Sequence, residues 1–301
     1  MLEANKVVDV TNITKHFGHR EVLHHLSFSL SRGRIIGLVG PNGAGKTTLM
    51  KILLGLVPIE TGNVRVAGYP VTNQQHKVIQ KQVGALIEHP ALYPFLSGEE
   101  HLHLLTNDAI AIDHIIAELG MERYRRRLAK HYSLGMKQKL GIAMALINQP
   151  SLVILDEPMN GLDPRSIKMF RSLIRQRAAA GTTFLISSHI LSELEKVVDD
   201  ILVISEGHLL LQTTMAALQQ TPPKAIGIKT NNDAASIKIL REGHYLISGS
   251  QLILTGALTS QLDDIIRKIQ ANNLQILSIQ ERGNDLETVL LRQLAQEREE
   301  A

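Results

Sequence analysis

The sequence predicts an α/β fold, in which strands of a parallel sheet alternate with helices, followed by a small α+β domain. An apolar, β-branched run at 34–39 precedes a glycine-rich segment and then a run of helical composition at 49–54. A second apolar run, 152–155, opens an alternation of strands and helices typical of a parallel sheet. Beyond residue 224 the order of elements is β-α-β-β-α-β, which indicates a split α+β module.

The elements of the first domain are predicted from apolar patterns and from helix-start signals. Strands are expected at 7–10, 26–30, 34–39, 63–66, 83–87, 152–155, 183–187 and 201–204, with residues 14–18 between the first two. Helices are expected at 49–54, 164–179 and 190–198, with a largely helical segment from 96 to 148. Ser97 followed by Glu100 matches a capping box, and Pro164 suits the first turn of its helix.

Two domains of unequal size are expected. Residues 1–220 form the first, with a helical subdomain at about 90–150, and a linker follows at 221–224. The second, 224–301, is predicted to contain strands at 225–230 and 274–279, a hairpin over 245–256 turning at Gly249–Ser250, and helices at 234–240, 260–271 and 285–296. A dimer-stabilising or regulatory role is the simplest hypothesis for this domain.

Composition argues against several classes of protein. Of the 301 residues only 3% are aromatic, which argues against stacking platforms for single-stranded nucleic acid. The net charge is +3, and positive and negative residues are interspersed along the chain. The densest basic run, 123–130, is expected to be a solvated helix face, so no nucleic-acid partner is predicted. The absence of cysteine excludes disulfides and thiolate metal sites. The polar start predicts no signal peptide, and no window approaches the ~20 apolar residues of a membrane helix, so a membrane role requires a partner chain.

The glycine-rich segment has the spacing of a phosphate-binding loop. Its members are Gly40, Pro41, Asn42, Gly43, Ala44, Gly45, Lys46, Thr47 and Thr48. A strand before it and a helix after it supply the context that this motif needs, because backbone N–H groups and the helix dipole then face one anion. Lys46 is expected to reach the β- and γ-phosphates, Thr47 to bind Mg²⁺, and Thr48 to donate to the α-phosphate. The alternative, a chance match in a chain of this length, is expected about once in a hundred.

The run 152–155 ends in Asp156 and Glu157, at the rim of the predicted sheet beside the phosphate loop. Asp156 is expected to bind Mg²⁺, directly or through water, and Glu157 to polarise the water that attacks the γ-phosphate. Alone, the two carboxylates would be interpreted as a solvated strand end. Together with the glycine loop they predict a P-loop NTPase site for ATP and Mg²⁺.

These motifs, over about residues 7–220, resemble the ATP-binding subunits of ABC transporters. Tyr132-Ser133-Leu134-Gly135-Met136 occupies the place of that family's Leu-Ser-Gly-Gly-Gln signature; Ser133 and Gly135 match, whereas Leu134 and Met136 depart. The resemblance implies that this segment contacts the γ-phosphate of an ATP bound mainly by the opposite subunit. A homodimer that holds ATP between its two halves is therefore expected.

Three further positions take their roles from the same resemblance. Asp163, in Asn160-Gly161-Leu162-Asp163, matches the loop through which the two copies communicate. His189 matches the histidine that senses the γ-phosphate and orients the attacking water. Phe17 matches the aromatic residue that stacks on adenine, the alternative being a buried core phenylalanine.

Glu88 departs from the family pattern, which usually has glutamine there, in contact with Mg²⁺ and the nucleophilic water. Together with the Ser-Leu-Gly-Met signature, Glu88 resembles the subgroup that exports lantibiotics and bacitracin-like peptides. A carboxylate should bind metal more strongly and repel the γ-phosphate when metal is absent. We therefore expect Glu88 to couple hydrolysis to transport rather than to act as the base.

The sequence thus favours the ATP-hydrolysing subunit of a peptide exporter, bound to membrane-spanning permeases at the cytoplasmic face of the membrane. Two alternatives remain from the ABC class: a soluble ATPase that acts on ribosomes or DNA, and a subunit for another substrate. A P-loop kinase or GTPase is disfavoured by the signature and by His189, and no Asn-Lys-x-Asp guanine motif is present.

Overall fold

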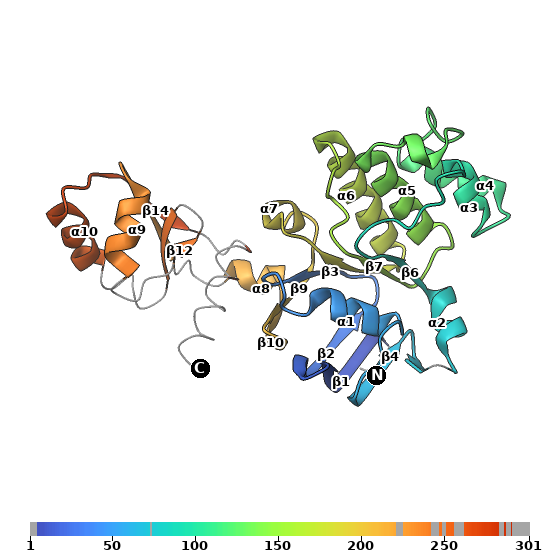
Figure 1. The fold of residues 1–301 in the computed structure, drawn as a ribbon, viewed down its shortest axis with the longest axis horizontal. Coiled ribbons are helices and arrows are strands. Elements are labelled where there is room, and N and C mark those ends of the chain that lie inside the picture. The colour runs from blue at the N-terminus through green and yellow to red at the C-terminus, as the bar shows by residue number, and fades with distance from the viewer. Residues whose placement is uncertain are drawn as a thin grey trace. The chain divides into compact units, whose positions relative to one another are not determined.

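The computed structural model describes residues 5–72, 74–220, 225–241, 247–248, 251–255, 262–282, 286 and 290. The chain divides into two compact units, Met1–Gln212 and Thr213–Ala301, and Figure 1 shows the elements of each. None of the helices in the described residues combines the length and apolar character needed to span a membrane.

An antiparallel sheet in the first unit contains β1 (Lys6–Phe17), β2 (Arg20–Ser31), β4 (Thr61–Val66) and β5 (Tyr69–Pro70), in the order β2-β1-β4-β5. β1 and β2 are much longer than the predicted strands 7–10 and 26–30, and residues 14–17 belong to β1 rather than to a connection. The reason is irregular pairing: the register between the two strands shifts repeatedly, for example between Val10 and Ile13. Each bulge interrupts the alternation by which a strand is recognised from its sequence.

The second sheet has the strand order β10-β9-β3-β8-β7-β6. Its strands are β3 (Ile35–Val39), β6 (Val83–Leu86), β7 (Leu152–Leu155), β8 (Thr183–Ser187), β9 (Asp200–Ser205) and β10 (His208–Thr214). β3 pairs in parallel with β8 and β9, and β7 pairs in parallel with β6 and β8. Every residue of β3, β7 and β8 is buried, as expected of a parallel sheet covered on both faces. β10 was not predicted, because most of its residues are only half-buried or exposed.

Helices cover both faces of the parallel sheet. In Figure 1, α5 (Leu134–Leu146) and α6 (Pro164–Ala179) lie on one side, and α1 (Lys46–Leu53) lies on the other, next to β1 and β2. α6 has its predicted bounds, and Asp163 caps its N-terminus by accepting a hydrogen bond from the N–H of Ser166. α7 (Leu191–Leu194) is shorter than the predicted 190–198, and residues 195–197 form a turn. α2 (His76–Gln82) was not predicted.

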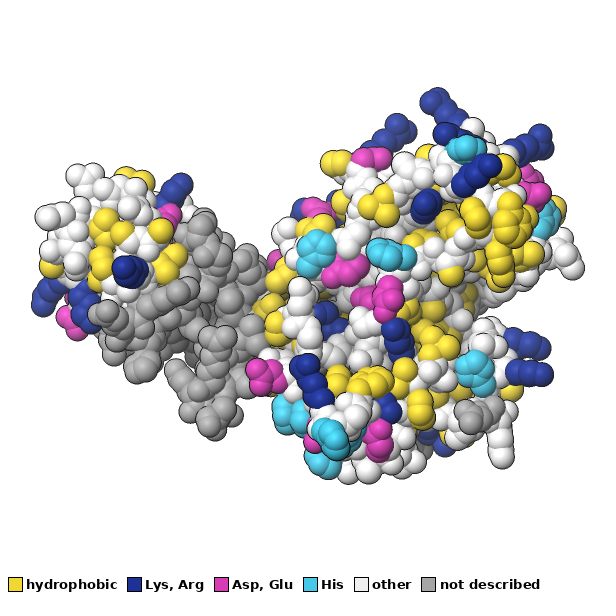
Figure 2. All heavy atoms as spheres, viewed as in Figure 1, with side chains coloured by type: hydrophobic (Ala, Val, Ile, Leu, Met, Phe, Trp, Pro, Cys, Tyr) yellow, Lys and Arg dark blue, Asp and Glu magenta, His cyan; other side chains and the backbone are white. Residues whose placement is uncertain are grey.

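The segment predicted to be helical contains α3 (Gly98–His103), α4 (Ala109–Glu118), a short 3₁₀ helix (Ala129–His131) and α5. The capping box at the start of α3 is confirmed: Ser97 accepts from Glu100 N–H, and Glu100 accepts from Ser97 N–H. On the face shown in Figure 2, Lys and Arg side chains in this region project separately. The predicted helix face is wrong for the run 123–130, which lies in turns and in the 3₁₀ helix, and Arg125 within it is half-buried and paired with Glu99 and Asp113.

The second unit has its own small sheet, in the order β12-β13-β11-β14. Its elements are α8 (Met215–Gln220), β11 (Ala225–Thr230), α9 (Asp233–Arg241), β12 (Ile247–Ser248), β13 (Gln251–Thr255), α10 (Leu262–Ala271) and β14 (Ile276–Arg282). From β11 to β14 the order is the predicted β-α-β-β-α-β, around a core that includes Ile228, Leu240 and Ile265. The predicted linker 221–224, the turn at Gly249–Ser250 and most of the predicted helix 285–296 lie outside the described residues.

Candidate nucleotide-binding site

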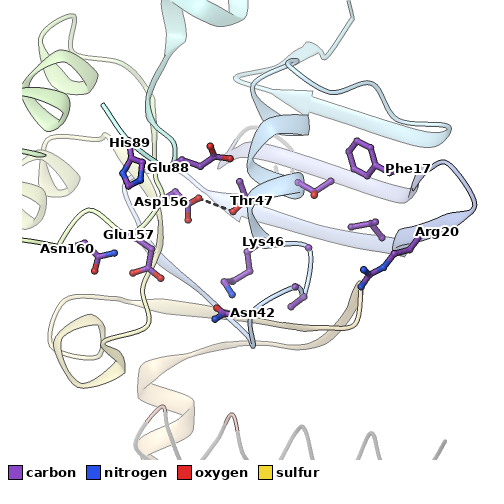
Figure 3. A pocket seen from close by; sticks show the side chains of 15 residues that line it. Phe17, Arg20, Asn42, Lys46, Thr47, Glu88, His89, Asp156, Glu157 and Asn160 are labelled. Atoms are coloured by element: carbon purple, nitrogen blue, oxygen red, sulfur yellow. Dashed lines mark hydrogen bonds between the residues drawn. The ribbon is translucent and has the colours of Figure 1, made fainter. Parts of the chain in front are cut away.

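A cavity of about 550 Å³ lies where the two sheets of the first unit meet the phosphate loop. Figure 3 shows that its side chains come from several parts of the chain. The lining residues are Phe17, Arg20, Val22, Asn42, Gly43, Ala44, Gly45, Lys46, Thr47, Thr48, Glu88, His89, Asp156, Glu157 and Asn160. The cavity therefore contains seven consecutive residues of the predicted phosphate loop and both predicted carboxylates.

The loop ends at Gly45, which has a φ of 97° and forms the N-cap of α1. That left-handed conformation favours glycine, and no side chain caps the helix, so its first N–H groups are free to bind an anion. Gly40 is required for a different reason. A Cβ atom there would lie 1.9 Å from the carbonyl oxygen of Ile204, at the end of β9.

The ammonium group of Lys46 donates to the carbonyl oxygens of Gly40 at 2.7 Å and Pro41 at 2.9 Å. Burial lowers the pKa of Lys46, and the nearby charges of Glu157 and Asp156 oppose that shift. Phosphate oxygens would replace neutral carbonyl acceptors with charged ones, and charge-assisted hydrogen bonds are stronger. The position of Lys46 thus suits the predicted contact with a polyphosphate.

Asp156 connects the phosphate loop to the end of β8. Its Oδ2 accepts from Thr47 Oγ1 at 2.9 Å, and its Oδ1 accepts from Ser187 Oγ at 2.5 Å. Figure 3 shows the bond to Thr47. A hydroxyl and a carboxylate oxygen side by side suit Mg²⁺, which takes one or two carboxylates and completes its shell with phosphates and water. Within the described residues there is no group of three His, Cys, Asp or Glu that could hold a metal ion.

Glu157 lies against His189, a contact that the sequence did not predict. His189 Nδ1 lies 2.7 Å from Glu157 Oε2, and His189 N–H donates to the same oxygen at 3.1 Å. Glu157 has a φ of 53°, a strained conformation for a residue with a side chain. Two contacts hold its backbone in place: Glu157 N–H donates to Ser187 Oγ, and Gln138 donates to its carbonyl oxygen.

The sequence did not single out Ser187 and Gln138, although both bond the residues that follow β7. Ser187 is fully buried; it donates to Asp156 and accepts from Glu157 N–H, so one hydroxyl positions both acidic residues. A polar residue directly after the apolar run 184–186, two positions before His189, was the available signal. Gln138 offered none, because it lies 19 residues from Glu157 in the middle of a helix.

Glu88 lines the same cavity, but its carboxylate is paired with a cation. Lys51 Nζ donates to Glu88 Oε1 at 2.7 Å, and this bond lowers the pKa of Glu88. Glu88 has a φ of 61° and a largely exposed side chain. Its predicted contact with Mg²⁺ would therefore compete with Lys51, a residue that sequence reasoning did not identify.

Phe17 stands at the rim of the cavity with 53% of its surface exposed. The alternative of a buried core phenylalanine is therefore wrong. The ammonium group of Lys15 lies 5.2 Å from the centre of the ring. An exposed ring on a nucleotide-sized cavity is suitable for stacking on a base, as predicted.

The signature residues do not reach this cavity. Ser133 caps α5 by accepting from Met136 N–H, and a Cβ atom at Gly135 would lie 2.6 Å from the carbonyl oxygen of Gly161. Ser133, Gly135 and Asp163 are absent from the lining of the cavity, as are Gly40, Pro41 and His189. The predicted nucleotide contacts of Ser133, Gly135 and Asp163 thus stay predictions, which require a second copy of the chain.

Comparison with known proteins identifies the family. The ABC transporter family model matches residues 23–160. A bacitracin transport ATP-binding protein (BcrA) of Enterococcus faecalis is 34% identical over 95% of this chain and 96% of its own length. This chain belongs to the ATP-binding proteins of ABC transporters. The family hydrolyses ATP to power transport.

Two further comparisons agree with this assignment. A lantibiotic transport ATP-binding protein (SrtF) of Streptococcus pyogenes is 39% identical over 68% of this chain and 90% of its own length. A solved ATP-binding subunit of an ABC transporter is 29% identical, with a TM-score of 0.66, over 71% of this chain and 92% of its own. The predicted P-loop fold and the family resemblance are confirmed.

Proposed function

We propose that this chain is the ATP-hydrolysing subunit of an exporter for antimicrobial peptides of the bacitracin or lantibiotic type. The similarity to the bacitracin transport protein carries this proposal, because it extends over 95% of the chain. The match to the lantibiotic transport protein covers 68% of the chain, a share comparable with the first unit alone. We therefore rank a bacitracin-like substrate above a lantibiotic.

The catalytic roles follow from the contacts in the cavity. Lys46 exchanges the carbonyls of Gly40 and Pro41 for oxygens of the β- and γ-phosphates. Glu157 orients water and takes its proton, while His189 positions the Glu157 carboxylate through the contact between its Nδ1 and Glu157 Oε2. Mg²⁺, held by Thr47 and Asp156, would neutralise charge that develops on the phosphates. Phe17 would stack on the adenine ring.

Two copies of the chain complete the site in this proposal. Ser133 is exposed at the N-terminus of α5, and Gly135 packs on the loop that contains Gly161. In a face-to-face dimer, Ser133 and the N–H groups that follow it would contact a γ-phosphate held by the other copy. Closure then depends on differential binding, since only the closed dimer contacts that phosphate from both sides.

A pair of membrane-spanning permeases is the proposed partner, which places the chain at the cytoplasmic face of the membrane. The helical subdomain of about residues 90–150 would transmit closure to the cytoplasmic loops of those permeases. Two features support this arrangement: the relatives are transport ATP-binding proteins, and no described helix could span a membrane.

The test is a peptide-sensitivity assay in a strain that lacks this gene but retains the neighbouring permease genes. The deletion should raise sensitivity to bacitracin, and the wild-type gene should restore protection. Lys46→Ala and Glu157→Gln, expressed at the same level, should not. Unchanged sensitivity to both bacitracin and a lantibiotic such as nisin would contradict peptide export.

A pull-down from solubilised membranes tests the partner. Recovery of polytopic membrane proteins with the tagged chain supports the exporter. Lys168→Ala, an exposed change on α6, should recover the same proteins. Recovery of ribosomes or DNA instead would favour the soluble alternative.

A further inference from the structure

Two residues on one face of α1 contact two carboxylates of the nucleotide cavity. Thr47 and Lys51 are four positions apart, so their side chains project from successive turns on the same side of the helix. Thr47 bonds Asp156, and Lys51 bonds Glu88. The helix that carries the predicted Mg²⁺ ligand thus also carries the cation that pairs with Glu88.

The two carboxylates emerge from neighbouring strands. β6 and β7 pair in parallel with Leu86 opposite Leu155, and Asp156 N–H donates to the carbonyl oxygen of Leu86. Asp156 directly follows β7, and Glu88 lies two residues beyond the end of β6. Both line the same cavity, and Figure 3 shows them on the same side of it as Thr47. Glu88 is therefore placed to approach a metal bound by Thr47 and Asp156.

The ion pair that holds Glu88 is suited to opening. It lies at the surface, with 61% of the Glu88 side chain and 35% of the Lys51 side chain exposed. Exposed ion pairs contribute little net stability, so exchanging this one for a metal costs little. The left-handed backbone at Glu88 adds strain that an alternative position of the loop would relieve.

We propose that Lys51 is a positioning residue that holds the Glu88 carboxylate away from the metal side of the nucleotide site until ATP and Mg²⁺ bind. The proposal rests on the proposed nucleotide site and adds a contact to it. While paired, Lys51 neutralises Glu88, so the carboxylate does not repel an incoming polyphosphate. Once released, Glu88 adds an oxygen ligand near Mg²⁺, and the loop that contains it moves with the metal.

The test measures how strongly nucleotide binding depends on metal, without relying on turnover. A fluorescent ATP analogue is titrated with the purified full chain in EDTA and in Mg²⁺. The measured quantity is the dissociation constant in EDTA divided by that in Mg²⁺. Lys51→Met should raise this ratio on the order of threefold to tenfold, the effect of one exposed charge contact. The unpaired carboxylate weakens metal-free binding and strengthens binding in the presence of metal. Manganese titration followed by electron paramagnetic resonance should show the same gain in metal affinity.

Three variants separate positioning from a general loss of charge. Lys51→Arg keeps the cation and should restore the wild-type ratio. Lys6→Met breaks an ion pair of similar length and exposure, 2.8 Å to Asp9, on β1, and should leave the ratio unchanged. In a Glu88→Gln background, Lys51→Met should no longer raise the ratio.

The proposal would be overturned if Lys51→Met raised the ratio of dissociation constants equally in the Glu88→Gln background. It would also be overturned if Lys51→Met alone did not raise that ratio. Failure of the wild-type chain to bind any adenine nucleotide would instead overturn the proposed function itself. The two failures are distinguishable, because the first requires a wild-type protein that binds the analogue.

Discussion

His189 Nδ1 lies 2.7 Å from Glu157 Oε2, and the backbone N–H of His189 donates to the same carboxylate oxygen. One residue therefore contacts the carboxylate of Glu157, the proposed general base, in two ways. Since β7 and β8 pair in parallel, this contact joins the carboxyl ends of adjacent strands. The proposed base thus lies two residues beyond the end of β7, and His189 lies two residues beyond the end of β8.

Glu157→Gln should retain nucleotide binding and lose hydrolysis. The amide has nearly the same shape as the carboxylate but cannot accept the proton from water, so kcat should fall by about 10²–10⁴-fold. With ATP the variant should accumulate as a closed dimer on a sizing column. Glu206→Gln, an exposed change in the turn after β9, is the control. A Glu157→Gln protein that stays monomeric with ATP would contradict the two-copy site.

Ser187→Ala should lower both stability and kcat. The hydroxyl is buried and bonds two acidic residues, so its removal leaves Asp156 Oδ1 and Glu157 N–H without that partner. The expected cost is about 1–3 kcal/mol, measured as a lower denaturant midpoint. Ser188→Ala is the matched control, because Ser188 is also buried but bonds only the nearby Ile190 N–H among the described contacts. Equal effects of the two substitutions would show that Ser187 has no special role.

The central parallel strands β3, β7 and β8 were predictable because each is buried on both faces. β7 and β8 therefore have the predicted bounds, and β3 differs by a single residue. Helix α6 was equally predictable, since Pro164 and the capping Asp163 mark its start. The bulged strands β1 and β2 were not, because each register shift breaks the period of two.

Contacts between distant side chains were beyond sequence reasoning. Lys51 and Glu88 are 37 positions apart, and nothing in either local pattern indicates that they pair. Gly135 matched a family motif, but its tight approach to Gly161 depends on how α5 packs on the neighbouring loop. The residues proposed to touch phosphate were thus recognised from local motifs, whereas the residues that contact and position them required the fold.

Lys46→Ala should weaken ATP binding without unfolding the protein. Loss of the charged hydrogen bonds to phosphate is expected to raise the dissociation constant about 10- to 100-fold. Burial lowers the pKa of Lys46, which means that the fold disfavours its charge. Removing that charge offsets the loss of the two bonds to the carbonyls of Gly40 and Pro41, so the thermal midpoint without nucleotide should change little. Isothermal titration with ATP, with Lys168→Ala as the exposed control, checks the binding; a large fall in the midpoint would contradict this reasoning.

The salt bridge between Glu99 and Arg125 predicts a pH-dependent stability. Arg125 donates to both carboxylate oxygens of Glu99, at 2.8 and 3.0 Å, and these bonds lower the pKa of Glu99 below its ordinary 4.5. A lowered pKa contributes stability above the unfolded value, and this contribution is lost as pH falls through the folded value. Glu99→Gln should thus cost about 1 kcal/mol at pH 7.

The difference between Glu99→Gln and the wild type should narrow progressively below pH 4.5, in denaturant titrations of the two proteins at each pH. Glu122→Gln, an exposed change in the same subdomain, should have little effect at any pH. A gap between Glu99→Gln and the wild type that stays constant at low pH would show that packing, rather than charge, accounts for the effect.

Gly135→Ala should disrupt the closed dimer more than the binding of nucleotide to one copy. The added methyl group would lie 2.6 Å from the carbonyl oxygen of Gly161, so the backbone at Gly161 must shift. Neither Gly135 nor Gly161 lines the cavity, and the dissociation constant for ATP in one copy should stay within about threefold of the wild type.

In a Glu157→Gln background, the added Gly135→Ala should reduce the ATP-dependent dimer on a sizing column. Lys137→Ala, on the same helix, is the control, and an undiminished dimer would show that the Gly135–Gly161 contact is not needed for closure.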